Sequence, residues 1–190
     1  MKTRTVLVGL LALGGALLAG AIILFMPLKI ATPQLFGMHC AAQVCTEDEQ
    51  DLAAALELFR SARGEVEAMA DTKLPNLHAV MCKSDACYAR FGGGAERAIS
   101  FPFLGMVVAG RSWQNYIVRH EMIHWLQFEH FGAFETMSYP AWFREGMAYA
   151  LSEAPASDIP PEFAQWMAQY REWEGKRSLT TVLSNKPLFD

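Results

Sequence analysis

Apolar residues in this chain change their spacing several times, and each change predicts a different element. After an acidic stretch with the pattern of a helix capping box, Leu52, Leu56 and Phe59 recur at helical spacing. We therefore expect a helix over about 47–62, and the sequence leaves open whether it continues to Ala70.

The middle of the chain has the pattern of short strands. Residues 78–82 and 87–91 read as two strands joined by a polar turn, and residues 99–109 are apolar and β-prone. Pro102 and Gly105 interrupt this third run. Proline within a strand indicates a sheet edge, where an extended peptide could pair, although a buried strand with a kink fits equally well.

Helical spacing returns in the second half of the chain. We expect one helix over about 112–131, a second over about 141–153 and a third after Pro160-Pro161. The third carries an apolar stripe that is typical of core packing: Phe163, Trp166, Met167, Tyr170 and Trp173. These elements predict an α+β domain with a small sheet.

The amino-terminal run has a different character from the rest. Residues 6–28 contain no charge, and twenty-three helical residues span about 34 Å, enough to cross a bilayer. Lys2 and Arg4 precede the run and favour an orientation with the rest of the chain on the far side. We therefore predict a single-pass anchor in the cytoplasmic membrane over residues 1–29 and an extracytoplasmic domain over 30–190, with a cleaved signal peptide as the alternative.

Charge and cysteine content narrow the environment of this domain. The net charge of −4, without any basic block, argues against a nucleic-acid partner. The cysteines occur as two pairs with four residues between the members. Local disulfides, 40–45 and 82–87, are the simplest pairing and agree with an oxidising compartment. A zinc site built from all four cysteines is the alternative.

The most informative motif lies in the helix expected over 112–131. It is the HExxH sequence that runs from His120 through Glu121 to His124. Residues four apart lie on one helix face, so both imidazoles can bind one Zn²⁺. Glu121 lies near the open metal position, where a carboxylate can act as general base towards a bound water.

A third protein ligand is needed, and the sequence offers two candidates. His130 lies six residues after His124, a spacing similar to that of the metzincin pattern HExxHxxGxxH. Gln127 stands where that pattern has the glycine that allows the helix to break. If the helix continues, His130 faces away from the metal.

The second candidate is Glu145, in the segment Pro140-Ala-Trp-Phe-Arg-Glu-Gly-Met-Ala-Tyr149. With HExxH, this segment resembles the gluzincin branch of the zincin metallopeptidases, the peptidase MA-like group, in which a Glu-Gly on the following helix supplies the third ligand. Twenty residues separate His124 from Glu145, close to the interval usual in that family. The resemblance covers about residues 112–153 and implies a zincin-like domain with Zn²⁺ on His120, His124 and Glu145. The glycine after the ligand would let the two helices approach closely.

The resemblance also directs attention to a donor for the oxyanion of the transition state. Tyr149 is the first choice because it shares a helix face with Glu145, and it stands where thermolysin-like members have an Asp that orients the first His. Gln127 lies on the metal-facing stripe, where it can support a ligand or line the cleft. The other donor candidates are Tyr139, Arg144 and His130.

These observations lead to a functional hypothesis with two rivals. We expect a membrane-anchored zinc metallopeptidase that hydrolyses peptide bonds of a peptide or protein substrate outside the cytoplasmic membrane. One rival is a zinc amidase or deformylase-like hydrolase, which a deep closed pocket would favour. The other is a catalytically silent zincin that acts as a binding module, which has no need of the base Glu121.

Overall fold

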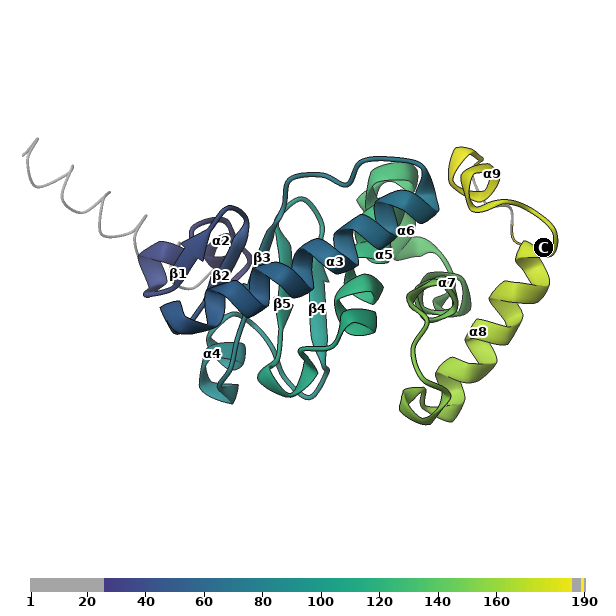
Figure 1. Cartoon of the computed structure of the whole chain (residues 1–190). Coiled ribbons are helices and arrows are strands. Elements are labelled where there is room, and N and C mark those ends of the chain that lie inside the picture. The colour runs from purple at the N-terminus through teal and green to yellow at the C-terminus, as the bar shows by residue number, and fades with distance from the viewer. Residues whose placement is uncertain (1–25, 186–188, 190) are drawn as a thin grey trace, which may run out of the picture.

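The protein, seen here as a computed structural model, is described over residues 26–185 and residue 189. A five-stranded mixed sheet lies at one side of the domain and a helical hairpin at the other (Figure 1). The strands are β1 (His39–Ala41), β2 (Val44–Thr46), β3 (His78–Met81), β4 (Ala98–Phe101) and β5 (Gly105–Val108). The helices are α2 (Met26–Ala31), α3 (Leu52–Ala70), α4 (Asp85–Arg90), α5 (Asn115–Phe131), α6 (Ala133–Ser138), α7 (Ala141–Ser152), α8 (Pro161–Glu174) and α9 (Leu179–Ser184).

The sheet has the strand order β1-β2-β3-β5-β4. The three central strands are parallel to one another, whereas β1 and β4 pair antiparallel at the two edges. Side chains along a strand alternate between the two faces. In β3, for example, Ala79 and Met81 join one buried cluster and Val80 joins the other.

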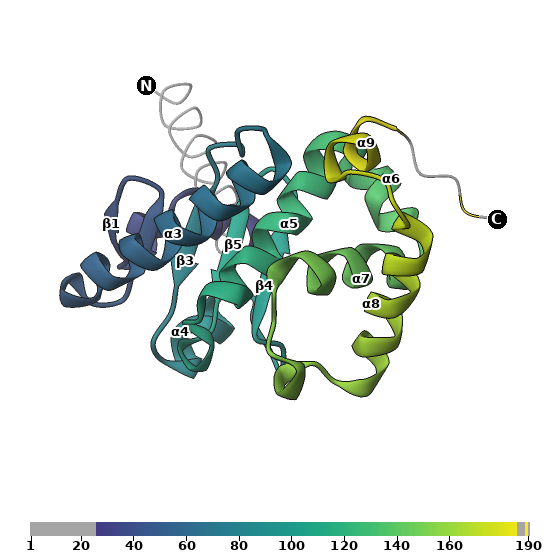
Figure 2. The same cartoon turned by 45° about the vertical axis from the view of Figure 1, so that its right-hand side comes forward.

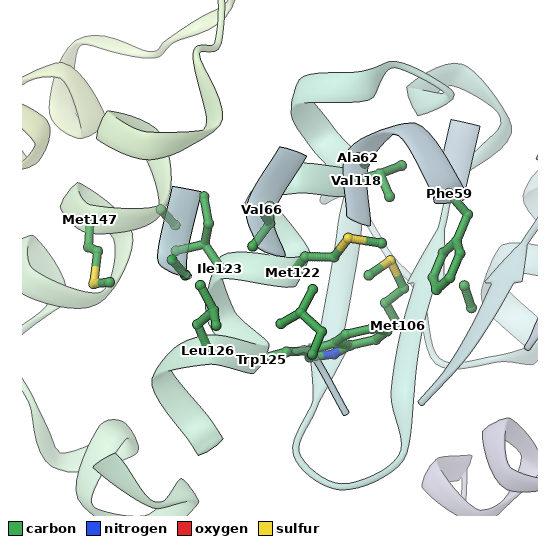
Figure 3. Close-up of a cluster of buried hydrophobic side chains, with 14 of the residues drawn as sticks. Phe59, Ala62, Val66, Met106, Val118, Met122, Ile123, Trp125, Leu126 and Met147 are labelled. Atoms are coloured by element: carbon green, nitrogen blue, oxygen red, sulfur yellow. The ribbon is translucent and has the colours of Figure 1, made fainter. Parts of the chain in front are cut away.

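Each face of the sheet is covered by a different pair of helices. Helices α3 and α5 pack side by side over one face (Figures 1 and 2), and their apolar side chains meet those of the strands in the larger core. Figure 3 shows this core, where Phe59 of α3 lies beside Met106 of β5 and Trp125 of α5. The opposite face packs a smaller cluster against α2 and α4.

Helix α5 confirms the prediction of a helix over about 112–131, and the apolar spacing explains its orientation. Val118, Met122 and Trp125 are buried on the core side. The helix runs unbroken through Gln127 and ends at Gly132, whose φ of +85° lies in the region that glycine adopts without steric cost.

Helices α7 and α8 form an antiparallel hairpin beyond α5. The bounds of α7 and the start of α8 were predicted to within one residue. A Cβ atom on Gly146 would lie 2.3 Å from the backbone oxygen of Trp166. The glycine after Glu145 therefore permits close approach to α8, rather than to the HExxH helix as we had predicted.

The first predicted helix, expected over about 47–62, begins at Leu52 and ends at Ala70. Thr46 belongs to β2, where it pairs with Met81, so the expected capping box does not form. A short 3-10 turn over Glu49–Asp51 leads into α3, which continues through Gly64 to Ala70. The longer of the two alternatives is confirmed.

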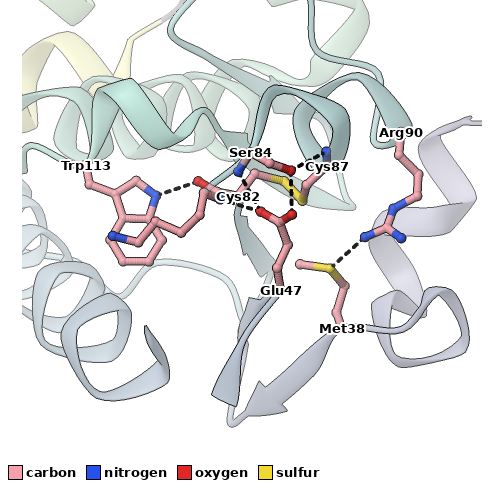
Figure 4. The surroundings of a disulfide bond; sticks show 8 residues. Met38, Glu47, Cys82, Ser84, Cys87, Arg90 and Trp113 are labelled. Atoms are coloured by element: carbon pink, nitrogen blue, oxygen red, sulfur yellow. Dashed lines mark hydrogen bonds between the residues drawn. A yellow bond between two sulfur atoms is a disulfide. The ribbon is translucent and has the colours of Figure 1, made fainter. Parts of the chain in front are cut away.

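The strand predicted over 87–91 is wrong, because this segment forms α4. The hydroxyl of Ser84 accepts a hydrogen bond from the backbone N–H of Cys87 at 3.0 Å and so caps the helix. The carboxylate of Glu47 accepts hydrogen bonds from the backbone N–H groups of Lys83 and Ser84 (Figure 4). Such capping fixes a helix start that β-prone residue types do not indicate.

The run over 99–109 is a hairpin rather than one strand. Pro102 lies in the turn between β4 and β5, and Phe103 has a φ of +65° there. β4 is an edge strand of the sheet. Of the two alternatives for this segment, the sheet edge is therefore confirmed over the buried strand with a kink.

Both predicted disulfides are present. Cys40 and Cys45 are cross-strand partners in β1 and β2. Cys82 follows β3 and joins Cys87 in α4 (Figure 4). Within the described chain no cysteine is left free, so the alternative of a four-cysteine zinc site is excluded.

The predicted transmembrane helix requires a correction. No helix within the described residues is both long enough and apolar enough to cross a bilayer. Helix α2 covers only Met26–Ala31, and residues 1–25 of the predicted segment 1–29 lie outside the described part of the chain. Over the described residues the fold class is therefore an α+β domain with a small mixed sheet, and the transmembrane helix that we had included in the fold class is unsupported.

Candidate metal centre

The two histidines of the HExxH motif point in the same direction from α5. Their Nε2 atoms lie 3.2 Å apart, and the ring planes meet at 78°. Both side chains are mostly buried, with 13% of each exposed. The spacing of four residues along an unbroken helix produces this arrangement.

Glu145 on α7 completes a group of three potential ligands. Its Oε2 atom lies 3.5 Å from Nε2 of His120 and 3.5 Å from Nε2 of His124. Zinc–nitrogen and zinc–oxygen bonds of about 2.0–2.1 Å at tetrahedral angles place neighbouring donors about 3.3 Å apart. The three observed separations are close to this value, so the donor set has the size and the composition of a zinc site.

The electrostatics of the triad favour a positive charge between the donors. Burial is the largest influence on the pKa of Glu145 and raises it, but His124 and His120 together lower it well below its usual range. Burial likewise lowers the pKa of His124, yet the nearby carboxylates of Glu145 and Glu121 raise it to about 9. A cation in this position is therefore stabilised, whether it is a proton or a metal ion.

Gln127 orients His124. The Nδ1–H group of His124 donates to Oε1 of Gln127 at 2.8 Å, which leaves Nε2 to face the centre of the triad. The amide nitrogen of Gln127 donates in turn to the backbone oxygen of Arg144 at 2.9 Å. This fully buried side chain supports a ligand and also ties α5 to α7. Its place on the metal-facing stripe was the signal available in the sequence.

Glu121 lies beside the triad and is largely buried, with 6% of the residue exposed. It lines the same cleft as the three potential ligands. Its backbone oxygen accepts a hydrogen bond from the hydroxyl of Ser100 at 2.9 Å, which links α5 to the edge strand β4. The backbone of the proposed base is thus tied to the sheet edge.

The triad opens into a cleft of about 730 Å³. The cleft is lined by residues 98–100 of β4, by residues of α5 that include the triad histidines, and by residues of α7 and the start of α8. β4 is the outermost strand, and no further strand pairs with it within the described chain. An unpaired strand edge therefore runs along the cleft.

Tyr149 also lies in this cleft. Its ring contacts that of His120 edge to face, with 4.5 Å between the centroids, and stacks on Phe163 at 4.9 Å. Burial raises the pKa of its hydroxyl, and the charge of Glu145 raises it further, so the hydroxyl keeps its proton at neutral pH. It can serve as a hydrogen-bond donor beside the triad.

The other donor candidates are distributed differently. Arg144 lines the cleft. Tyr139 is buried among aromatic rings, including Phe131 and Phe143, and is not among the residues that line the cleft. His130 is exposed near the end of α5 and is not part of the triad, as expected for a helix that continues through Gln127.

A polar cluster that lines the cleft was not predicted from the sequence. Arg97, just before β4, donates to the hydroxyl of Tyr116 at 2.8 Å and lies 3.7 Å from Asp158. The Tyr116 hydroxyl donates to the same carboxylate. Tyr116 precedes His120 by four residues, so helical spacing could have placed it on the cleft side of α5. Arg97 and Asp158 come from distant segments, and no local pattern identifies them.

Comparison of the chain with protein-family models, with curated proteins and with solved structures finds no match. The likeness to gluzincins consequently rests on the residues themselves. These are the HExxH motif, the Glu145-Gly146 pair on the following helix, and the distances between their donor atoms.

Proposed function

We propose that this protein is a zinc-dependent peptidase, with His120, His124 and Glu145 as the metal ligands. The observation that supports this most strongly is the convergence of the three donor atoms at separations suited to tetrahedral Zn²⁺. Two imidazoles and one carboxylate are a ligand set typical of catalytic zinc, which keeps a fourth position open for water.

The residues around the triad supply the remaining chemistry. A bound Zn²⁺ would lower the pKa of a coordinated water to about 7. Glu121 accepts a proton from the attacking water and passes it to the leaving amine. Tyr149 donates a hydrogen bond to the carbonyl oxygen as its negative charge grows. Gln127 keeps His124 in the orientation that these steps require.

The shape of the site favours an extended peptide as substrate. The free edge of β4 presents backbone N–H and C=O groups along the cleft, and such an edge can pair with a peptide in β conformation. A zinc amidase for small molecules would suit a deep closed pocket better than this strand-lined cleft. A silent binding module would have no use for a base such as Glu121 beside the triad.

The two disulfides support an oxidising compartment as the place of this activity. Structural disulfides persist outside the cytoplasm, where thiols are not kept reduced. We therefore propose that the peptidase acts on extracytoplasmic peptides or proteins.

Zinc content and peptide hydrolysis test this function together. The purified full chain should contain about one Zn²⁺, and a strong chelator should remove both the metal and the activity. Glu121→Gln should retain zinc and lose about 10²- to 10⁴-fold in turnover, since an amide of similar shape cannot accept the proton.

An exposed glutamate provides the matched control for this substitution. Glu57 lies on α3 and does not line the cleft, so Glu57→Gln should leave zinc content and turnover unchanged. A well-folded wild-type protein that takes up no zinc would overturn the proposal. Normal hydrolysis by Glu121→Gln would contradict the assigned base.

A further inference from the structure

Two arginines line the cleft, and they differ in their hydrogen-bond and ion-pair partners. Arg97 lies 3.7 Å from Asp158 and donates to the Tyr116 hydroxyl. The side chain of Arg144 has no hydrogen bond or ion pair with any residue that the structure describes. Its Nε atom is buried and lacks an acceptor. Because the guanidinium has no acceptor among the described residues, an acceptor from outside the chain would be stabilising.

The backbone of Arg144 is held in a fixed position beside the triad. It directly precedes Glu145 on α7, and its backbone oxygen accepts the hydrogen bond from Gln127. Arg144 lines the same cleft as Glu145 and the two histidines, so a substrate at the triad shares the cleft with this side chain. Glu145 itself contacts the two histidines and does not form an ion pair with Arg144.

Apolar residues share the cleft with Arg144, as do the carboxylates of Glu121 and Glu145. Phe128, Met137 and Ala141 line the cleft together with it. Charges interact more strongly beside apolar groups than in open water, because the local dielectric constant is lower. The planar guanidinium can donate two parallel hydrogen bonds, an arrangement that fits a carboxylate.

We propose that Arg144 binds a carboxylate of the peptide substrate close to the scissile bond. This inference rests on the proposed peptidase function and narrows its substrate class to peptides with an acidic group near the cleavage point. The carboxylate comes either from a Glu or Asp side chain or from the free C-terminus of the peptide. Arg144 is thus a specificity residue, distinct from the base and the metal ligands.

A scanned peptide series distinguishes the two sources of the carboxylate. The probes are neutral octapeptides in which a single glutamate occupies each position in turn, with a matched glutamine series. Each peptide is prepared with a free and with an amidated C-terminus. Hydrolysis is measured as kcat/KM for each bond cleaved, and affinity is measured by titration calorimetry on the Glu121→Gln variant, so that binding can be read without turnover.

The wild type should prefer one kind of acidic peptide, either with a glutamate or with a free C-terminus, by about 10- to 100-fold over its neutral match. This is the size expected for hydrogen bonds to a charged group. Arg144→Gln should abolish this preference without changing zinc content, so that kcat/KM falls by a larger factor for the acidic peptide than for the neutral amidated one. Arg144→Lys keeps the positive charge but lacks the two parallel N–H donors of the guanidinium, so it should retain only part of the preference. Arg60→Gln, on the exposed part of α3, is the control and should change neither quantity.

Failure of this inference is separable from failure of the peptidase assignment. Hydrolysis that does not depend on a glutamate or on a free C-terminus would overturn the role of Arg144. So would a preference that survives in Arg144→Gln. Neither result would contradict the peptidase assignment. If no peptide is cleaved, the calorimetric comparison still decides. Equal affinity for glutamate and glutamine probes, with free and amidated ends alike, would then reject the carboxylate site.

Discussion

Helices α5 and α7 both supply potential metal ligands to the triad, but they hold them by different means. In α5 the helix itself sets the distance between His120 and His124, because residues four apart share a face. In α7 the position of Glu145 depends on tertiary contacts, namely the packing at Gly146 against α8 and the hydrogen bond from Gln127. The positions of the two histidines are thus set locally in the sequence. The position of Glu145 depends on how α7 packs against α5 and α8.

The largest effect should follow from removing the ligand that α7 provides. Glu145→Ala leaves two imidazoles, and we expect the protein to lose most of its zinc and all measurable peptide hydrolysis. Metal content by mass spectrometry after dialysis is the measurement. His130→Ala is the control, since that residue is exposed on α5 outside the triad. Zinc loss in His130→Ala with retention in Glu145→Ala would reverse the ligand assignment.

A smaller loss should follow from cutting the link between the two helices. Gln127→Met keeps the side-chain volume but removes the acceptor for His124 and the donor to Arg144. Loss of such a supporting group typically lowers metal affinity by about 10- to 100-fold. Competition with a chromophoric chelator measures the change. Gln165→Met, at an exposed position of α8, should leave the affinity unaltered. An unchanged affinity in Gln127→Met would mean that α5 alone orients His124.

The smallest expected effect concerns the packing that positions α7. Gly146→Ala places a Cβ atom 2.3 Å from the Trp166 backbone oxygen, so α7 and α8 must separate. We expect a loss of about 1–3 kcal/mol in the free energy of unfolding, measured by denaturant titration.

Gly64→Ala is the contrasting control for this packing test. Its Cβ would meet nothing within 4 Å in the middle of α3, and alanine there should stabilise the protein by about 0.5–1 kcal/mol. Equal effects of the two substitutions would show that helix propensity, rather than the contact with α8, governs position 146.

The same contrast explains which features the sequence could predict. The helix over 115–131 and the shared face of its histidines follow from apolar spacing and from the HExxH motif. The bounds of α7 and the start of α8 follow from the prolines that precede these helices and from their apolar residues. Both disulfides join cysteines only five positions apart, so local pairing was the simplest expectation.

The features that were not predicted from the sequence depend on partners far away in the chain. Residues 87–91 have β-prone side chains, yet the Ser84 cap and the carboxylate of Glu47, far away in the chain, fix a helix there. The cluster of Arg97, Tyr116 and Asp158 joins three separate segments. The partner of Gly146 on α8 is likewise set by the fold and not by its neighbours in sequence.

The free edge of β4 has a consequence for self-association. An exposed strand edge is a template for pairing with another copy of the same chain, and long flat edges promote aggregation. β4 is only four residues long, Pro102 follows it at once in the turn, and Arg97 precedes it with an exposed charge. Short length, proline and charge all limit the growth of an intermolecular sheet. The edge can therefore remain open to a single peptide without becoming a nucleus for fibres.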